Sequence, residues 1–85
     1  MTKILIVDDE KSIRKTLREI LEYEKYEVTE AQDGMECLAK FKRAKFDVVI
    51  LDIKMPNLDG METLERLQQM SPETPIIMIS GHANI

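Results

Sequence analysis

The chain has 85 residues, with 12 Lys or Arg against 16 Asp or Glu, and its formal net charge is −4. This acidic balance argues against a binder of nucleic acid or anionic membranes, because few cations would replace the counterions on phosphate. The longest apolar runs have four residues, far short of the roughly 20 that a membrane helix needs, and one cysteine cannot form an internal disulfide. We therefore expect a single small acidic domain in the cytoplasm.

Four short segments have the composition of β-strands. Residues 4–7, 48–51 and 76–79 are continuous runs of Ile, Val, Leu and Met, which is typical of strands covered on both faces in a parallel sheet. Residues 26–31 instead alternate apolar and polar side chains, with Tyr26 and Val28 separated by Glu27. This pattern predicts an edge strand that is partly exposed to solvent.

Helical patterns lie between these segments. An apolar stripe predicts a helix over about residues 10–24, and its members are Ile13, Leu17, Ile20 and Leu21. Asp33 and Asp59 each stand three residues before a glutamate, an arrangement that resembles a capping box and predicts two further helix starts. Pro72, after Ser71, ends the last of these helices.

The element order β-α-β-α-β-α-β predicts an α/β fold, a doubly wound parallel sheet with helices on both faces. Strand 76–79 looks like a central strand, although only residues 80–85 follow it. We therefore expect residues 1–85 to be the N-terminal portion of a longer domain. Alone, the uncovered last strand should favour self-association or strand exchange.

Polar side chains follow three of the apolar strands at once. Asp8 and Asp9 follow the first, Asp52 the third and Ser80 the fourth, and ligands of open parallel sheets bind outside these carboxyl ends. Three carboxylates in one pocket would repel each other by about 4 kcal/mol per pair at about 4 Å and an effective dielectric of about 20. An all-oxygen site of this kind suits Mg²⁺.

Each of these residues also has a simpler interpretation. Asp8 or Asp9 taken singly is more often a helix N-cap, Asp52 could cap or begin a turn, and Ser80 could be an ordinary loop hydroxyl. It is their combination after three strands that favours a functional site.

The three motifs together resemble the receiver domain of two-component response regulators. They read ILIVDDE at residues 4–10, VILDIKMPNLDG at 49–60 and IIMISG at 76–81. The resemblance implies a flavodoxin-like fold with strand order 2-1-3-4-5, whose fifth strand is missing from this chain. It also implies that Asp52 accepts a phosphoryl group from a phosphohistidine of a sensor histidine kinase.

The resemblance further implies a role for each site residue. Asp9 and Asp52 would bind Mg²⁺ directly, the backbone carbonyl of Lys54 would be the third protein ligand, and Asp8 would act through metal-bound water. Ser80 would donate a hydrogen bond to the phosphoryl group and move toward it on activation. Residues 80–85 are similar to receivers of nitrogen-regulation-type transcription activators that work with an alternative sigma factor. An output domain of the same longer chain, and not this segment, would then bind DNA.

Two other classes of function compete with this interpretation. A Mg²⁺-dependent hydrolase or nuclease could use the same carboxylates, but the sequence shows no obvious general base, and Asp52 is followed by Ile53 and Lys54 rather than by the Asp-x-Asp pattern of dehalogenase-like phosphatases. An interaction module that is never phosphorylated is the other. We favour a phosphoacceptor signalling domain that is not an enzyme beyond its own phosphoryl transfer and slow dephosphorylation.

Overall fold

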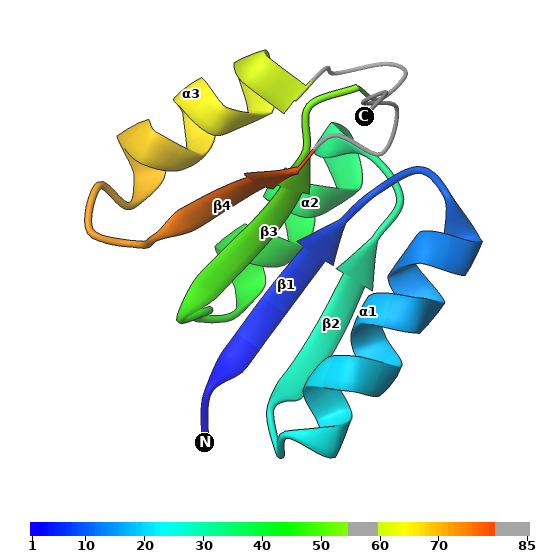
Figure 1. Cartoon of the computed structure of the whole chain (residues 1–85). Coiled ribbons are helices and arrows are strands. Elements are labelled where there is room, and N and C mark those ends of the chain that lie inside the picture. Colours follow the sequence, from blue (N-terminus) through cyan, green and yellow to red (C-terminus); the bar gives the residue numbers. More distant parts are fainter. Residues whose placement is uncertain (55–59, 80–85) are drawn as a thin grey trace.

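A computed structural model describes residues 1–54 and 60–79 of the chain. Four parallel strands form one sheet in the order β2-β1-β3-β4 (Figure 1). The elements in chain order are β1 (Lys3–Val7), α1 (Lys11–Tyr23), β2 (Glu27–Ala31), α2 (Gly34–Arg43), β3 (Val48–Asp52), α3 (Gly60–Met70) and β4 (Ile76–Ile79). The structure confirms the predicted parallel sheet and strand order, including β2 at its edge.

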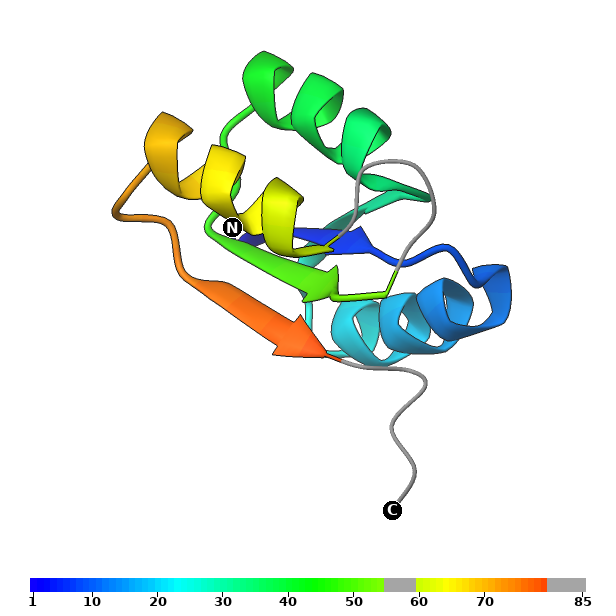
Figure 2. The same cartoon turned by 90° about the horizontal axis from the view of Figure 1, so that it is seen from above.

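The helices cover both faces of the sheet. Figure 2 shows α1 on one face and α2 and α3 on the other. Leu5 and Val7 of β1 belong to the core cluster under α2 and α3, whereas Ile4 and Ile6 belong to the cluster that packs against α1. Successive side chains of a strand point to opposite faces, so β1 is buried on both, which explains its uninterrupted apolar sequence.

Only part of the predicted apolar stripe of α1 packs on the sheet. Leu17 and Leu21 pack against the cluster of Ile4, Ile6 and Val28, but Ile20 is 57% exposed. Leu17 and Leu21 are four residues apart and share one face, whereas Ile20 lies about 100° around the helix from Leu21. The structure confirms the predicted helix, and Ile20 lies outside the part of its apolar stripe that is buried.

The start of α2 confirms the predicted capping box. The side chain of Asp33 accepts a hydrogen bond from the backbone N–H of Glu36 at 2.8 Å. The carboxylate of Glu36 in turn accepts one from the backbone N–H of Gln32 at 2.6 Å. These two bonds satisfy donors that a helix start leaves free. Asp59, the corresponding residue before α3, lies outside the described residues.

Strand β4 is the last strand of the sheet within the described residues. It pairs with β3 on one side, with Ile76 opposite Val49, and its Ile77 is 52% exposed. Ile76 and Met78 pack against the core under α2 and α3, so Ile77 points to the opposite, α1 side of the sheet. Among the described helices, none is long and apolar enough to span a membrane.

We expect the 85-residue polypeptide to self-associate through β4, because an edge strand offers unpaired N–H and C=O groups to another chain. Sedimentation velocity over a range of concentrations should show dimers or larger species. Ile77→Lys should reduce them, since a charge on an edge strand opposes pairing. Met70→Lys is the control, because Met70 is 40% exposed on α3. A strictly monomeric wild-type polypeptide that unfolds cooperatively would contradict this prediction.

Candidate functional site

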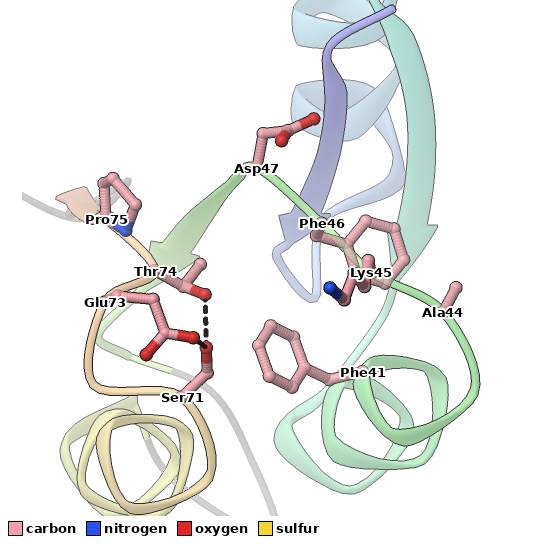
Figure 3. Close-up of a pocket in the computed structure, with 9 residues that line it drawn as sticks. All are labelled: Phe41, Ala44, Lys45, Phe46, Asp47, Ser71, Glu73, Thr74 and Pro75. Atoms are coloured by element: carbon pink, nitrogen blue, oxygen red, sulfur yellow. Dashed lines mark hydrogen bonds between the residues drawn. The ribbon is translucent and has the colours of Figure 1, made fainter.

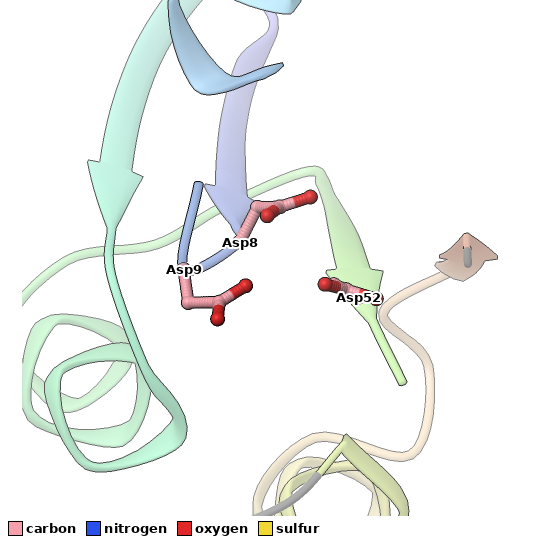
Figure 4. Close-up of side chains that lie close together, drawn as sticks. All are labelled: Asp8, Asp9 and Asp52. Atoms are coloured by element: carbon pink, nitrogen blue, oxygen red, sulfur yellow. The ribbon is translucent and has the colours of Figure 1, made fainter. Parts of the chain in front are cut away.

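The register of β1 and β3 brings Asp8 and Asp52 together. These strands pair in parallel with Val7 opposite Leu51. The residues that follow them, Asp8 and Asp52, therefore lie at the same carboxyl edge of the sheet. Figure 4 shows that Asp8 and Asp9, in the turn after β1, lie across from Asp52 at the end of β3. One carboxylate oxygen from each of the three lies within 4.8 Å of the others. The structure thus forms the acidic cluster that the sequence predicts.

The two oxygens of each buried carboxylate have different surroundings. Asp8 and Asp52 are 0% and 1% exposed. Oδ1 of Asp8 accepts a hydrogen bond from the backbone N–H of Glu10 at 2.9 Å, and Oδ1 of Asp52 accepts one from that of Lys54 at 3.1 Å. The Oδ2 atom of each is buried without a hydrogen-bond partner in the described part of the chain. Asp9, in contrast, is exposed to solvent.

These contacts decide between the interpretations that the sequence left open. The residue at the N-cap of α1 is Glu10, and no side chain caps this helix, so neither Asp8 nor Asp9 is the N-cap. Asp52 does begin a turn, because its side chain accepts the N–H of Lys54 two residues ahead. That contact uses Oδ1 only, and Oδ2 is the oxygen without a partner among the described residues.

Burial raises the pKa of the Asp8 carboxyl above its ordinary value of 3.8. The hydrogen bond from the Glu10 backbone opposes this shift, while the negative charges of Asp52 and Asp9 add to it. Desolvation and like charges both disfavour the ionised form. A positive charge in the cluster would therefore stabilise the carboxylates.

The carboxylates fit a hard divalent cation. Two buried oxygens without donors in residues 1–54 and 60–79, together with an exposed third carboxylate, form an all-oxygen set with open positions, which suits Mg²⁺. Lys54 lies two residues past the end of β3, and its backbone N–H contacts the Asp52 carboxylate, so its backbone lies at the same edge. Ser80 lies outside the described residues.

Gly60 fixes the backbone around Asp52. A Cβ atom at Gly60 would lie 2.3 Å from Cα of Ile53 and 2.5 Å from the carbonyl oxygen of Asp52. The first residue of α3 therefore packs directly on the peptide that follows Asp52, and this position has no room for a side chain. This contact holds the end of β3 against α3.

Arg14 is a residue near the site that sequence reasoning missed. Its guanidinium Nη1 donates a hydrogen bond to the backbone carbonyl of Asp8 at 2.6 Å, and its Nε donates to Glu30 of β2 at 2.9 Å. The available signal was a glutamate inside a predicted strand, together with Arg14 and Arg18 four residues apart on the preceding helix.

A separate cavity of about 300 Å³ lies at the opposite, amino end of β3 and β4 (Figure 3). Its lining consists of Phe41, Ala44, Lys45, Phe46, Asp47, Ser71, Glu73, Thr74 and Pro75. The hydroxyl of Ser71 is hydrogen-bonded to Glu73 at 2.9 Å and to Thr74 at 2.6 Å. Since these polar groups already satisfy one another, the acidic cluster is the better candidate site.

The sheet order and the acidic carboxyl edge define a flavodoxin-like α/β domain with a site suited to a cation. Residues 4–85 match the response regulator receiver domain, and the chain belongs to this family, the receivers of two-component signalling. It is 46% identical over 80 residues to the transcriptional regulatory protein ResD of Bacillus subtilis. The match covers 94% of this chain and 33% of ResD, so the chain spans about a third of the length of that relative.

Solved structures of receivers have the same fold. The response regulator TrrA of Thermotoga maritima, in complex with Mg²⁺ and BeF, superposes with a TM-score of 0.93 at 40% identity, over 98% of this chain and 72% of TrrA. TrrA in a complex with the histidine kinase ThkA superposes with a TM-score of 0.91 at 39% identity. This match covers 99% of this chain and 72% of the other. Both confirm the flavodoxin-like arrangement that the motifs predict.

The raised pKa of Asp8 predicts how stability depends on pH without Mg²⁺. Between pH 3.8 and the raised pKa, the folded state binds more protons than the unfolded state, so the free energy of unfolding falls as the pH rises. Asp8→Asn removes this penalty and should be more stable than the wild type at pH 7. The advantage should disappear below pH 3.8, where Asp8 is neutral in both states.

Chemical denaturation at a series of pH values measures this effect. Asp47→Asn is the matched control, because Asp47 is an exposed aspartate at the other end of β3 that accepts a backbone hydrogen bond from Lys3. Mg²⁺ should reduce the difference in the free energy of unfolding between the wild type and Asp8→Asn. An Asp8→Asn variant that is less stable than the wild type at pH 7 without Mg²⁺ would show that the ionised carboxylate does not disfavour folding.

Proposed function

We propose that Asp52 is the phosphoacceptor of this receiver and that a sensor histidine kinase supplies the phosphoryl group. The observation that carries the proposal is the buried Asp52 carboxylate, which lies beside Asp8 and Asp9 and whose Oδ2 has no hydrogen-bond partner among the described residues. The kinase–regulator complex of TrrA supports a kinase as the partner. In this proposal Asp9 binds the cation directly, Asp8 acts through a water bound to it, and neither is phosphorylated.

The reaction is nucleophilic attack by a carboxylate. An oxygen of Asp52 attacks phosphorus in line with the phosphorus–nitrogen bond of the phosphohistidine. The new oxygen–phosphorus bond forms as that bond breaks, and its electron pair stays on the imidazole nitrogen. The Lys54 N–H holds one Asp52 oxygen, and the packing of Gly60 on the Asp52 peptide limits movement of the strand end. Positioning together with electrostatic stabilisation supplies most of the catalysis in phosphoryl transfer.

The proposed cation is Mg²⁺, with Asp9, Asp52 and the backbone carbonyl of Lys54 as ligands and Asp8 acting through a bound water. A carboxylate has two oxygens, so Asp52 can bind a cation with one and accept the phosphoryl group with the other. When bound, Mg²⁺ would offset negative charge on the carboxylates and on the phosphoryl oxygens. The unpartnered oxygens of Asp8 and Asp52 support this assignment, as does the Mg²⁺-BeF complex of TrrA.

The remaining parts of the proposal concern the switch and its output. Ser80 would donate a hydrogen bond to the phosphoryl group and so favour one conformation of the domain. Residues 1–85 would be the N-terminal portion of a cytoplasmic regulator whose output domain controls transcription, as the name of ResD suggests. The link to activators that use an alternative sigma factor stays a prediction.

Phosphorylation should occur at Asp52 alone. After incubation with Mg²⁺ and acetyl phosphate or a phosphorylated kinase, borohydride reduction and mass spectrometry should place the modification on this residue. Asp52→Asn lacks the nucleophile and should lose at least about 100-fold in phosphorylation rate, because removal of a covalent nucleophile eliminates its pathway. Asp47→Asn should be phosphorylated normally. Label retained in Asp52→Asn at the wild-type level would refute the assignment.

Mg²⁺ binding should depend on the carboxylates of the cluster. Calorimetric titration should give weaker binding for Asp9→Asn and Asp52→Asn than for the wild type. Loss of a direct carboxylate ligand should weaken binding by about 10-fold or more, since each carboxylate supplies both a ligand atom and a charge. Equal affinity in all three proteins would exclude this site.

A further inference from the structure

The side chain of Arg14 links α1 to the acidic edge and to β2. Nη1 donates to the carbonyl oxygen of Asp8 at 2.6 Å, and Nε donates to Glu30 at 2.9 Å. Only 12% of the Arg14 side chain is exposed. A guanidinium has a rigid, planar set of donors, so the contact with Glu30 fixes the direction of the contact with Asp8.

The contact falls on the peptide that joins Asp8 to Asp9. The carbonyl of Asp8 belongs to this peptide, while the N–H of Asp8 donates to the carbonyl of Ala31 at 3.1 Å. Ala31 is the neighbour of Glu30 at the end of β2. The Asp8 backbone is therefore held on both sides, and the orientation of its peptide decides where the two carboxylates point.

We propose that Arg14 is a positioning residue that orients the Asp8–Asp9 turn for cation binding. This inference rests on the proposed Mg²⁺ site. Arg14 donates to the backbone of the site and not to its carboxylates, so it is neither a ligand nor a catalytic residue. Groups that orient metal ligands without touching the metal commonly alter affinity when they are replaced.

Arg18 is a matched control on the same helix. It also forms an ion pair with Glu30, and its Nη2 donates to a backbone carbonyl, that of Val28, at 3.0 Å. It pairs with Glu22 as well. Arg18 thus shares the partner and the type of contact of Arg14 but holds the middle of β2 instead of the turn after β1.

Positioning and simple electrostatics predict opposite changes. If Arg14 acted on the site only through its charge, Arg14→Gln would remove a positive charge near a cation site and strengthen Mg²⁺ binding. If Arg14 orients the turn, the same variant weakens Mg²⁺ binding. Arg14→Lys keeps the charge but loses the planar fork, so positioning predicts weaker binding here too.

The test is a Mg²⁺ titration by calorimetry of the full-length protein and its Arg14→Gln, Arg14→Lys and Arg18→Gln variants, each first shown to be folded by circular dichroism. We expect Mg²⁺ to bind about 10-fold more weakly to both Arg14 variants. Affinity in Arg18→Gln should stay within about two-fold of the wild type. Native-state hydrogen exchange should be faster at the Glu10 amide, which donates to Asp8, in the Arg14 variants only.

The outcomes separate this inference from the proposed function. Wild-type or tighter Mg²⁺ binding in Arg14→Gln, or an equal loss in Arg18→Gln, would overturn the positioning role while leaving the site itself intact. A wild-type protein that binds no Mg²⁺ would overturn the proposed site and with it the role of Arg14 in cation binding. In that case the exchange rate of the Glu10 amide would still decide whether Arg14 holds the turn.

Discussion

Strands β1 and β3 lie side by side in parallel, with Val7 opposite Leu51, and this register determines where the carboxylates meet. A shift of one residue would turn every side chain of a strand to the other face of the sheet. Because β1 is buried on both faces, such a shift would disrupt two core clusters at once. The packing of apolar side chains therefore fixes the position of Asp8 relative to Asp52.

The acidic cluster opposes the folded state that forms it. Asp8 and Asp52 are buried, and each has an oxygen that no described residue donates to, which disfavours folding. The core on both faces of β1 offsets this cost through buried apolar surface. A ligand that binds only the folded state stabilises it, so cation binding and folding of this domain should be linked.

The parts of the fold that could be predicted are those that local sequence encodes. Uninterrupted apolar runs identified β1, β3 and β4, and Asp33 with Glu36 identified the start of α2. The exposed Ile20 could not be predicted in the same way. Apolar spacing predicts the stripe of a helix, but the packing of the helix on the sheet decides how much of that stripe is buried.

The candidate site was predictable to a similar degree. Asp8, Asp9 and Asp52 follow their strands directly, so a parallel sheet was enough to bring them together. The contacts of Arg14 were not predictable, because they depend on how α1 lies relative to β2. Arg14 and its partner Glu30 are 16 positions apart in the sequence. Such contacts leave no local pattern of spacing.

Cys37 shows what the dense core under α2 means for chemistry in solution. This thiol is 0% exposed, and burial, with the nearby charge of Asp33, raises its pKa to about 12. The reactive thiolate is then only on the order of 10⁻⁵ of the folded population at pH 7. Alkylating reagents would therefore modify Cys37 mainly in molecules where α2 has separated from the sheet. The rate of this modification would therefore report how often α2 separates from the sheet, without any engineered cysteine.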